Sequence, residues 1–211
     1  MRIGILGTGT LATALGEGWA GAGHEVVIGG RSAAKAEEAA DRLGRTARAA
    51  APRDVVAGAD AVLLAVSWDG AEEMLRTAGA GDGSLRGTAL VDPTNAVRHG
   101  VGVLLTEPGE AMAHRIARAA PGAHVVKAFH LFPAAQWTRA RGVGEPPVTV
   151  PMCGDDPEAL RVVGELVRAV GGSPAVLGPL DRVRQLEEVA GFTIGLAFAG
   201  VDPNSAIPRL G

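Results

Sequence analysis

The sequence predicts an α/β fold of the Rossmann type, a doubly wound parallel sheet with a small C-terminal α/β extension. Three observations indicate this fold. The chain opens with a short apolar strand, a glycine-rich turn and a helix. Apolar, strand-like runs then alternate with helical stretches, as in a parallel sheet wrapped by helices. One of these runs, residues 61–66, is apolar throughout, which is typical of a strand buried on both faces.

The first unit of this fold consists of a strand over residues 2–6 and the turn Gly-Thr-Gly-Thr-Leu-Ala over residues 7–12. Gly7 permits a tight turn out of the strand, and Gly9 lets the backbone come close to a pyrophosphate. Ala12 is small enough for the following helix to pack against the sheet. The N-terminus of that helix offers unpaired N–H groups and a positive dipole end to phosphates. The turn therefore predicts a dinucleotide site, with an ordinary glycine-rich turn of another α/β protein as the alternative.

The residues after the second strand, which is expected over residues 24–28, indicate which dinucleotide is bound. An NAD site places Asp or Glu here to bind the ribose 2′-hydroxyl. This chain has Gly30, Arg31 and Ser32 instead, with Lys35 one helical turn later. A guanidinium, a hydroxyl and an ammonium attract a 2′-phosphate, which a carboxylate would repel. The pattern favours NADP; the alternative is that the two basic residues only form a solvated helix start.

The remaining elements follow from the spacing of apolar residues along the chain. Helices are expected over residues 33–43, 54–59, 70–78, 110–119, 156–171 and 180–199, and strands over residues 61–66, 88–91, 124–129, 148–153 and 175–177. A loop over residues 142–147 divides a dinucleotide-binding domain, residues 1–145, from an extension, residues 146–211, that we expect to pack on it as one compact unit. The last helix is apolar around much of its circumference, which favours burial between two copies of the chain and hence a homodimer.

The composition excludes several other classes of protein. Hydrophobic residues make up 47% and charged residues 20% of the chain, as in ordinary globular proteins. A net charge of −3 gives no reason to expect nucleic acid or an anionic membrane as a partner. Cys153 is the one cysteine, which excludes an internal disulfide, and no apolar stretch is long enough to span a bilayer. These two features favour a cytoplasmic protein. The histidines do not lie at metal-binding spacings, so we expect no metal site.

In a doubly wound sheet, ligands lie across the carboxyl ends of the strands. The ends of the first two strands, Gly7-Thr8-Gly9 and Gly30-Arg31, would hold the adenine half of the cofactor. The third end, Ser67-Trp68, would cover its pyrophosphate or ribose. Asn95 and His130, at the last two ends, would then flank the nicotinamide. The predicted ends carry Gly7-Thr8-Gly9, Gly30-Arg31, Ser67-Trp68, Asp92-Pro93-Thr94-Asn95 and Phe129-His130.

The chain lacks the residues of common acid–base and nucleophilic sites. It has no tyrosine and no GxSxG turn, and Cys153 has no obvious base partner. Hydride transfer between two flat redox rings needs their stacking and alignment, and little proton transfer by the protein. His130 is the titratable residue that we expect beside such rings, where it would orient them; a buried histidine bonded to backbone is the alternative. Lys127 is expected to point toward a helix or an interface.

Several segments of the chain carry a resemblance to one known family. They are Gly7-Thr8-Gly9 with Leu11, Gly30-Arg31 with Lys35, Trp68, His130 with Pro133-Ala134-Ala135, Cys153-Gly154-Asp155-Asp156, and Gly178-Pro179-Leu180. Together they resemble the reduced coenzyme F-420:NADP oxidoreductases over nearly the whole chain. The resemblance implies NADP contacts at Thr8 to Leu11, Arg31, Lys35, Trp68 and Val97, and a deazaflavin stacked on the nicotinamide near residues 130–135. Gly30 and Ser67 depart from the family pattern, which commonly has serine and proline at these positions.

The resemblance thus implies an oxidoreductase that transfers a hydride between NADP(H) and coenzyme F-420 as co-substrate, with these redox coenzymes as its partners. Two alternatives stay open: a related NADPH-dependent reductase of an imine, a flavin or a specialised metabolite, and a non-enzymatic NADP-binding protein. The candidate catalytic residue is His130, in an orienting role. The candidate cofactor-binding residues are Gly7, Thr8, Gly9, Thr10, Leu11, Ala12, Gly30, Arg31, Ser32, Lys35, Ser67, Trp68, Asn95, Val97 and Ala134.

Overall fold

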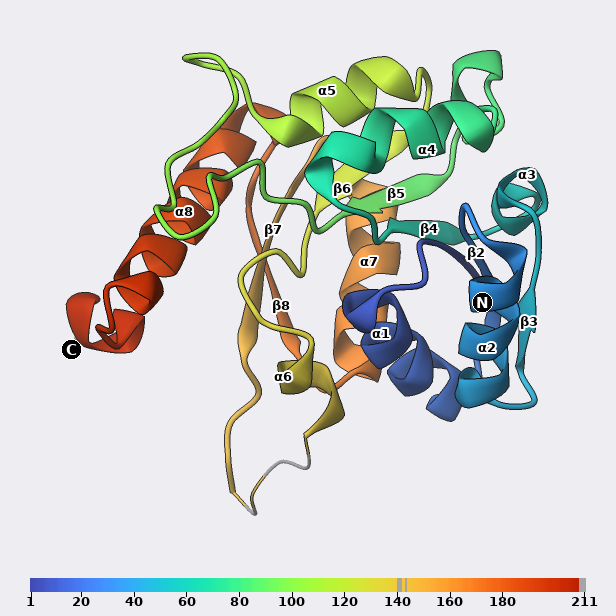
Figure 1. The fold of residues 1–211 in the computed structure, drawn as a ribbon, viewed down its shortest axis with the longest axis horizontal. Helices are drawn as coiled ribbons and strands as arrows, with labels where there is room; N and C mark the ends of the chain where they lie inside the picture. Colours follow the sequence, from blue (N-terminus) through green and yellow to red (C-terminus); the bar gives the residue numbers. More distant parts are fainter. Residues whose placement is uncertain (140–141, 143, 209–211) are drawn as a thin grey trace.

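The computed structural model describes residues 1–139, 142 and 144–208 of the chain. Within these residues, eight strands form one sheet in the order β3-β2-β1-β4-β5-β6-β7-β8 (Figure 1). Neighbouring strands are parallel, except that β6 and β7 are antiparallel, which confirms the predicted Rossmann-type α/β fold. The strands are β1 (Arg2–Leu6), β2 (Glu25–Gly29), β3 (Ala47–Ala49), β4 (Ala61–Leu64), β5 (Ala89–Asp92), β6 (His124–Lys127), β7 (Thr149–Gly154) and β8 (Ser173–Gly178).

Helices cover both faces of this sheet (Figure 1). Side chains of a strand alternate between the two faces, so β1 contributes to both apolar layers. Ile3 and Ile5 pack in one layer with residues of α1, α2 and α7, and Leu6 packs in the other with residues of α3, α4 and α5. The α-helices are α1 (Thr10–Gly21), α2 (Ala33–Leu43), α3 (Pro52–Val56), α4 (Ala71–Thr77), α5 (Met112–Ala119), α6 (Ala135–Thr138), α7 (Pro157–Ala169) and α8 (Val183–Phe198).

The strand order reverses at β1, which lies between β2 and β4. Ile5 in the middle of β1 is in register with Ile28 of β2 and with Leu63 of β4. Because the chain leaves β1 and β4 in opposite directions, a crevice opens at their carboxyl ends, where ligands bind in doubly wound sheets. The fold therefore places the predicted glycine-rich turn at the topological switch point.

The C-terminal extension continues the same sheet. Lys127 of β6 pairs with Cys153 of β7, and β8 then pairs in parallel with β7. Asp156 caps α7, because its Oδ1 accepts a hydrogen bond of 2.7 Å from the backbone N–H of Ala159. Pro157 follows as the first helical residue, a position that suits proline.

Two short elements were not predicted, the edge strand β3 and the single helical turn α6. A third difference is that β6 ends at Lys127, before Phe129, which was expected to be its last residue. Phe129 has a φ of +63°, so its backbone has left the extended conformation and turns the chain away from the sheet.

The last helix begins at Val183, after the 3-10 turn η3 (Leu180–Arg182), and it is buried on one side only. Leu186 and Ala190 are buried, whereas Phe192 and Phe198 are 51% and 54% exposed. Figure 1 shows α8 at the left of the molecule, with its C-terminal end projecting away from the sheet. Within the described part of the chain, no helix is both long and apolar enough to cross a membrane.

Candidate functional site

The turn between β1 and α1 requires glycine at its first position. Gly7 has a φ of +126°, and a Cβ added there would lie 2.0 Å from the carbonyl oxygen of Ala65. The backbone N–H of Gly7 donates a hydrogen bond of 2.7 Å to the carbonyl of Gly29. The turn is therefore wedged between the carboxyl ends of β2 and β4, and only a residue without a side chain fits there.

Gly9 is needed for a different reason. Its φ of −80° and ψ of −178° suit any residue, and a Cβ added there meets no described heavy atom within 4 Å beyond its chain neighbours. It is the N-cap of α1, and among the described residues no side chain caps this helix. The first N–H groups of α1 thus face open space beside Gly9, a cradle that suits a phosphate.

A cavity of about 460 Å³ opens beside this turn, at the switch point of the sheet. Several predicted cofactor-binding residues line it: Gly7, Thr8, Gly9, Gly30, Arg31, Ser32, Lys35 and Ser67. The structure thus brings the phosphate turn and the basic residues after β2 to one cavity, as the sequence analysis expects. Residues of the β4–α4 segment complete the lining: Ala65, Val66, Gly70, Glu73, Met74 and Thr77.

Charges in this cavity are mixed. Arg31 and Lys35 are exposed at the start of α2, and Ser32 caps that helix by accepting a hydrogen bond of 3.4 Å from the backbone N–H of Lys35. A hydrogen bond from the Ser67 hydroxyl lowers the pKa of Asp69, and the nearby charge of Arg31 lowers this pKa further.

The α4 residues of the cavity were missed by the sequence analysis. Gly70 ends the 3-10 turn just before α4, and Thr77 follows Glu73 by four positions and Met74 by three, so these α4 residues lie on one side of the helix. That spacing is a usable signal, because α4 directly follows the Ser67-Trp68 strand end that was itself predicted to cover the cofactor.

The carboxyl ends of β5 and β6 bring together Asn95 and His130, the two residues that were predicted to flank the nicotinamide. The side-chain Nδ2 of Asn95 donates a hydrogen bond of 2.7 Å to the backbone carbonyl of His130. The Oδ1 of Asn95 is buried and has no hydrogen-bond partner among the described residues. An unsatisfied buried acceptor is unusual in a native protein and is a feature of sites that bind a ligand.

His130 is 6% exposed, so its side chain is almost fully buried. Neither of its nitrogens makes a hydrogen bond of ordinary geometry within the described part of the chain. Burial lowers the pKa of His130 well below its usual value, the charge of Lys127 lowers it further, and the backbone of Leu186 opposes the shift. The ring is therefore neutral at physiological pH.

The backbone that carries His130 is held by an aromatic cluster. Phe129 is the one described non-glycine residue with a positive φ, a conformation that is costly for a bulky side chain. Its ring is buried edge-on against Trp19 and Trp137, with ring centroids 6.1 and 5.2 Å away. These contacts fix the turn through which the chain leaves β6.

Lys127, the last residue of β6, is fully buried and points toward a helix, as predicted. Its Nζ lies 3.0 Å from Oδ2 of Asp92 at the end of β5 and 2.9 Å from Oε1 of Glu187 in α8. It also donates a hydrogen bond to the carbonyl of Thr94. The lysine thus joins two strand ends and the last long helix.

The other predicted site residues do not line the cavity. Thr10, Leu11 and Ala12 form the first turn of α1, and Ala12 is fully buried in the contact of this helix with the sheet. Three more are not among its lining residues: Trp68 in the 3-10 turn η1 (Trp68–Gly70), Val97 in a bridge with Leu104, and Ala134 just before α6.

Comparisons with known proteins agree with this geometry. Residues 2–96 match the family model described as "NADP oxidoreductase coenzyme F420-dependent". Over 194 residues the chain is 28% identical to metalloreductase STEAP3 of Rattus norvegicus, an alignment that covers 89% of this chain and 36% of that protein. A crystal structure from Arthrobacter sp. FB24, provisionally described as an F420-dependent NADP-reductase, matches with a TM-score of 0.79 and 29% identity over 96% of each chain.

A reductive aminase from Aspergillus terreus in complex with NADPH4 matches with a TM-score of 0.67 and 22% identity, over 94% of this chain and 62% of that one. At this identity the likeness concerns the fold alone. The chain spans 36% of the length of the rat metalloreductase, so that protein's activity does not carry over as a whole. The match over residues 2–96 agrees with the resemblance stated above and with the coarser part of the functional prediction, an NAD(P)-binding oxidoreductase.

Proposed function

We propose that the protein transfers a hydride between NADP(H) and the deazaflavin coenzyme F-420, because residues 2–96 match the family model of coenzyme F420-dependent NADP oxidoreductases. The observation that supports this most directly is the cavity at the switch point, which combines a phosphate cradle with Arg31 and Lys35 and has no acidic residue at the end of β2. The cavity supports NADP(H) as one coenzyme, and the similarity to the family supports coenzyme F-420 as the other.

The cavity residues fit NADP group by group. The open space beside Gly9 and the N-terminus of α1 would receive the pyrophosphate, because no Cβ intrudes there. Arg31 and Lys35, together with the hydroxyl of Ser32, would bind the 2′-phosphate. The face of α4 that carries Met74 would lie against the adenosine.

The nicotinamide would extend toward the carboxyl ends of β5 and β6, where Asn95 and His130 are joined. Both coenzymes carry their own hydride chemistry, so the protein has to stack the two rings and keep water out. A neutral, buried His130 suits this task, because it adds no charge beside the rings. In this proposal His130 acts as a positioning residue, through the carbonyl that accepts from Asn95.

The experiment is to mix the protein with NADPH and oxidised coenzyme F-420 and follow the deazaflavin absorbance. We expect the absorbance to fall with NADPH and much more slowly with NADH. A Gly9→Ala variant, which keeps the fold but fills the phosphate cradle, serves as the control. No decrease at any pH would contradict the proposal. Turnover of an imine, a flavin or a ferric complex without F-420 would favour a related reductase, and tight NADPH binding without any acceptor would favour a non-enzymatic protein.

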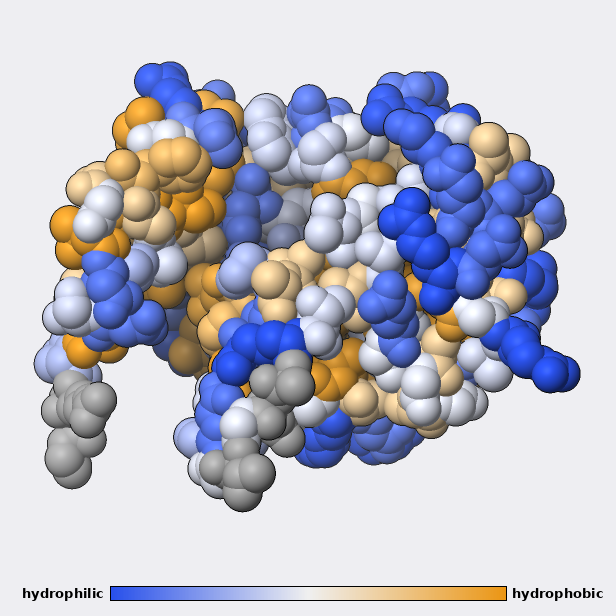
Figure 2. Space-filling model, turned by 60° about the horizontal axis from the view of Figure 1, so that its bottom comes forward, coloured by the Kyte–Doolittle hydropathy of each residue, from blue (hydrophilic) through white to orange (hydrophobic). Residues whose placement is uncertain are grey.

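We also propose that the protein is a homodimer that buries the exposed face of α8. Phe192 and Phe198 of this helix are accompanied by apolar residues of the loop after β5, Val101 and Val103, each 54% exposed. Figure 2 shows apolar surface gathered at the left of the molecule, where α8 lies, next to a hollow. Contiguous apolar surface of this kind is typical of protein interfaces.

A single charge on this face should separate the two copies. Replacing Phe192 with Glu places a carboxylate on the exposed apolar face of α8, and we expect the protein to change from dimer to monomer in analytical ultracentrifugation. Ala34→Glu introduces the same charge on an exposed position of α2, on the opposite side of the molecule, and should leave the dimer intact. A monomeric wild-type protein, or a dimeric Phe192→Glu variant, would contradict this interface.

A further inference from the structure

Lys127 lies at the centre of a buried polar network that the proposed hydride transfer does not itself require. The lysine and its two carboxylate partners, Asp92 and Glu187, are all fully buried. Glu187 also accepts hydrogen bonds from the backbone N–H groups of Met112 and Ala113, at 2.8 and 3.2 Å, at the start of α5. A network of this kind is seldom needed for stability, because apolar residues of similar size are often at least as stabilising.

The network controls the loop that follows β5. Oδ1 of Asp92 accepts hydrogen bonds from the backbone N–H and the hydroxyl of Thr94, at 2.8 and 2.6 Å, while the carbonyl of Thr94 accepts from Lys127. The backbone N–H, the hydroxyl and the carbonyl of Thr94 are thereby all held by Asp92 and Lys127.

The next residue, Asn95, continues the connection to β6. Its Nδ2 binds the carbonyl of His130, while its Oδ1 stays buried and without a partner among the described residues. A buried acceptor without a partner, next to a chain of bonded groups, is a feature of sites that bind a ligand.

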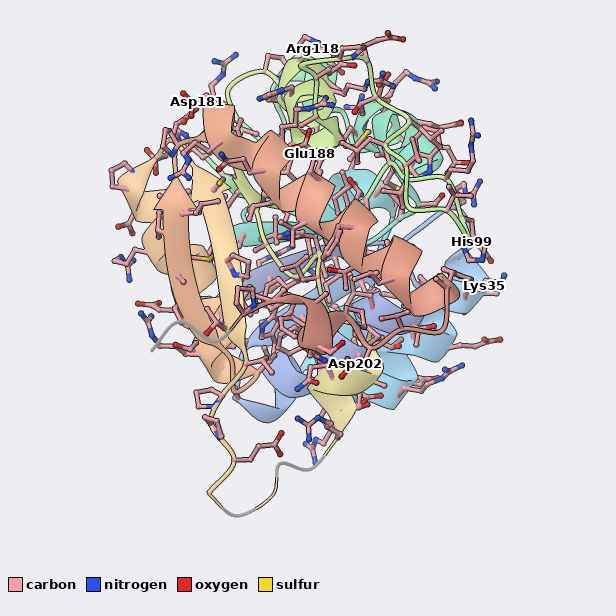
Figure 3. All side chains as sticks on the ribbon, turned by 90° about the vertical axis from the view of Figure 1, so that its left-hand side faces the viewer. Lys35, His99, Arg118, Asp181, Glu188 and Asp202 are labelled. Carbon is pink, nitrogen blue, oxygen red and sulfur yellow. The ribbon has the colours of Figure 1, made fainter. Side chains whose placement is uncertain are left out.

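We propose that Lys127 is a positioning residue for the nicotinamide half of NADP. Lys127 binds Asp92, Thr94 and Glu187, and these contacts fix the carboxyl ends of β5 and β6. Asn95 and His130, which follow these ends, are thereby kept in the geometry that binds the nicotinamide ring. This inference rests on the proposed function. Figure 3 shows α8, which supplies Glu187, lying across the front of the sheet from Asp181 to the loop of His99. The polar network therefore connects the last long helix to the strand ends, and its residues do not line the cavity that we assign to the adenosine half.

The test measures the binding of the nicotinamide half and of the adenosine half of the cofactor separately. The Lys127→Met variant is titrated with NADPH and with adenosine 2′,5′-bisphosphate, which carries the 2′-phosphate but no nicotinamide. We expect its affinity for NADPH to fall about tenfold or more, and its affinity for the bisphosphate to change less than about twofold. Failure of the wild-type protein to bind the bisphosphate would count against the proposed function instead of this inference.

Two further variants keep the test decisive. Glu187→Gln removes one charge at nearly constant shape, so it should fold where Lys127→Met does not, and we expect the same selective loss at about threefold. Leu166→Ala creates a buried cavity in α7 away from the network, and it should lower the melting temperature without changing either affinity. Any of three outcomes would overturn the inference, because the network would then serve stability alone. They are equal losses of affinity for both ligands, unchanged NADPH affinity in a folded variant, and unfolding of both network variants.

Discussion

Replacing Arg31 with Asp is expected to weaken the binding of NADPH about 100-fold and to leave the binding of NADH unchanged or slightly stronger. The substitution removes a charge-assisted hydrogen bond worth about 1.5–3 kcal/mol and adds repulsion between two anions. About 1.4 kcal/mol corresponds to a factor of ten in affinity, so these effects together reach a factor of about 100. NADH has no 2′-phosphate, and its ribose hydroxyls can bind the new carboxylate.

Fluorescence titrations of both coenzymes measure this difference. The matched control is Arg42→Asp, which makes the same change of charge on α2, at an exposed residue of its last turn that does not line the cavity. It should bind both coenzymes as the wild-type protein does, because exposed charges at this distance are screened by salt. An equal loss of NADPH and NADH affinity in the Arg31 variant would reject Arg31 as the residue that selects NADP.

The parts of the fold that the sequence predicts well are those whose determinants are local. Gly7, Gly9 and Arg31 follow one another around a single strand–turn–helix–strand unit, so their order along the chain fixes their order in space. The apolar run at residues 61–66 behaves in the same way, because β4 is buried on both faces whatever lies beside it.

The short elements could not be predicted, because neighbours in space determine them. The edge strand β3 reads Ala-Arg-Ala, which has no strand preference of its own, and it forms only because it pairs with β2. Phe129 shows the opposite case. Its apolar side chain suggests a strand, but the aromatic contacts with Trp19 and Trp137 hold its backbone in a turn.

The polar network around Lys127 depends on even more distant residues. Asp92, Lys127 and Glu187 are far apart along the chain, and no spacing within one element joins them. From its place in a strand, Lys127 could only be expected to point toward a helix or an interface. Which acids it binds follows only from the tertiary fold, in which α8 lies near the ends of β5 and β6.

Glycine to alanine substitutions in the β1–α1 turn should separate folding from cofactor binding. In Gly9→Ala, the new methyl group meets no described atom and the backbone angles suit alanine, so the stability of the free protein should be unchanged or higher by about 0.4–1 kcal/mol. NADPH affinity should nevertheless fall about 100-fold, because the methyl group occupies the space into which the pyrophosphate must come close to the backbone.

In Gly7→Ala both properties should be lost. The Cβ would lie 2.0 Å from the carbonyl oxygen of Ala65, so β1 and β4 must separate, and the positive φ adds strain; we expect a destabilisation of about 3 kcal/mol or more. Thermal unfolding without ligand and NADPH titration below the unfolding transition measure the two effects separately. Normal NADPH binding by a folded Gly9→Ala protein would show that no phosphate binds in the open space beside Gly9. The main argument that this cavity binds a dinucleotide would then be wrong.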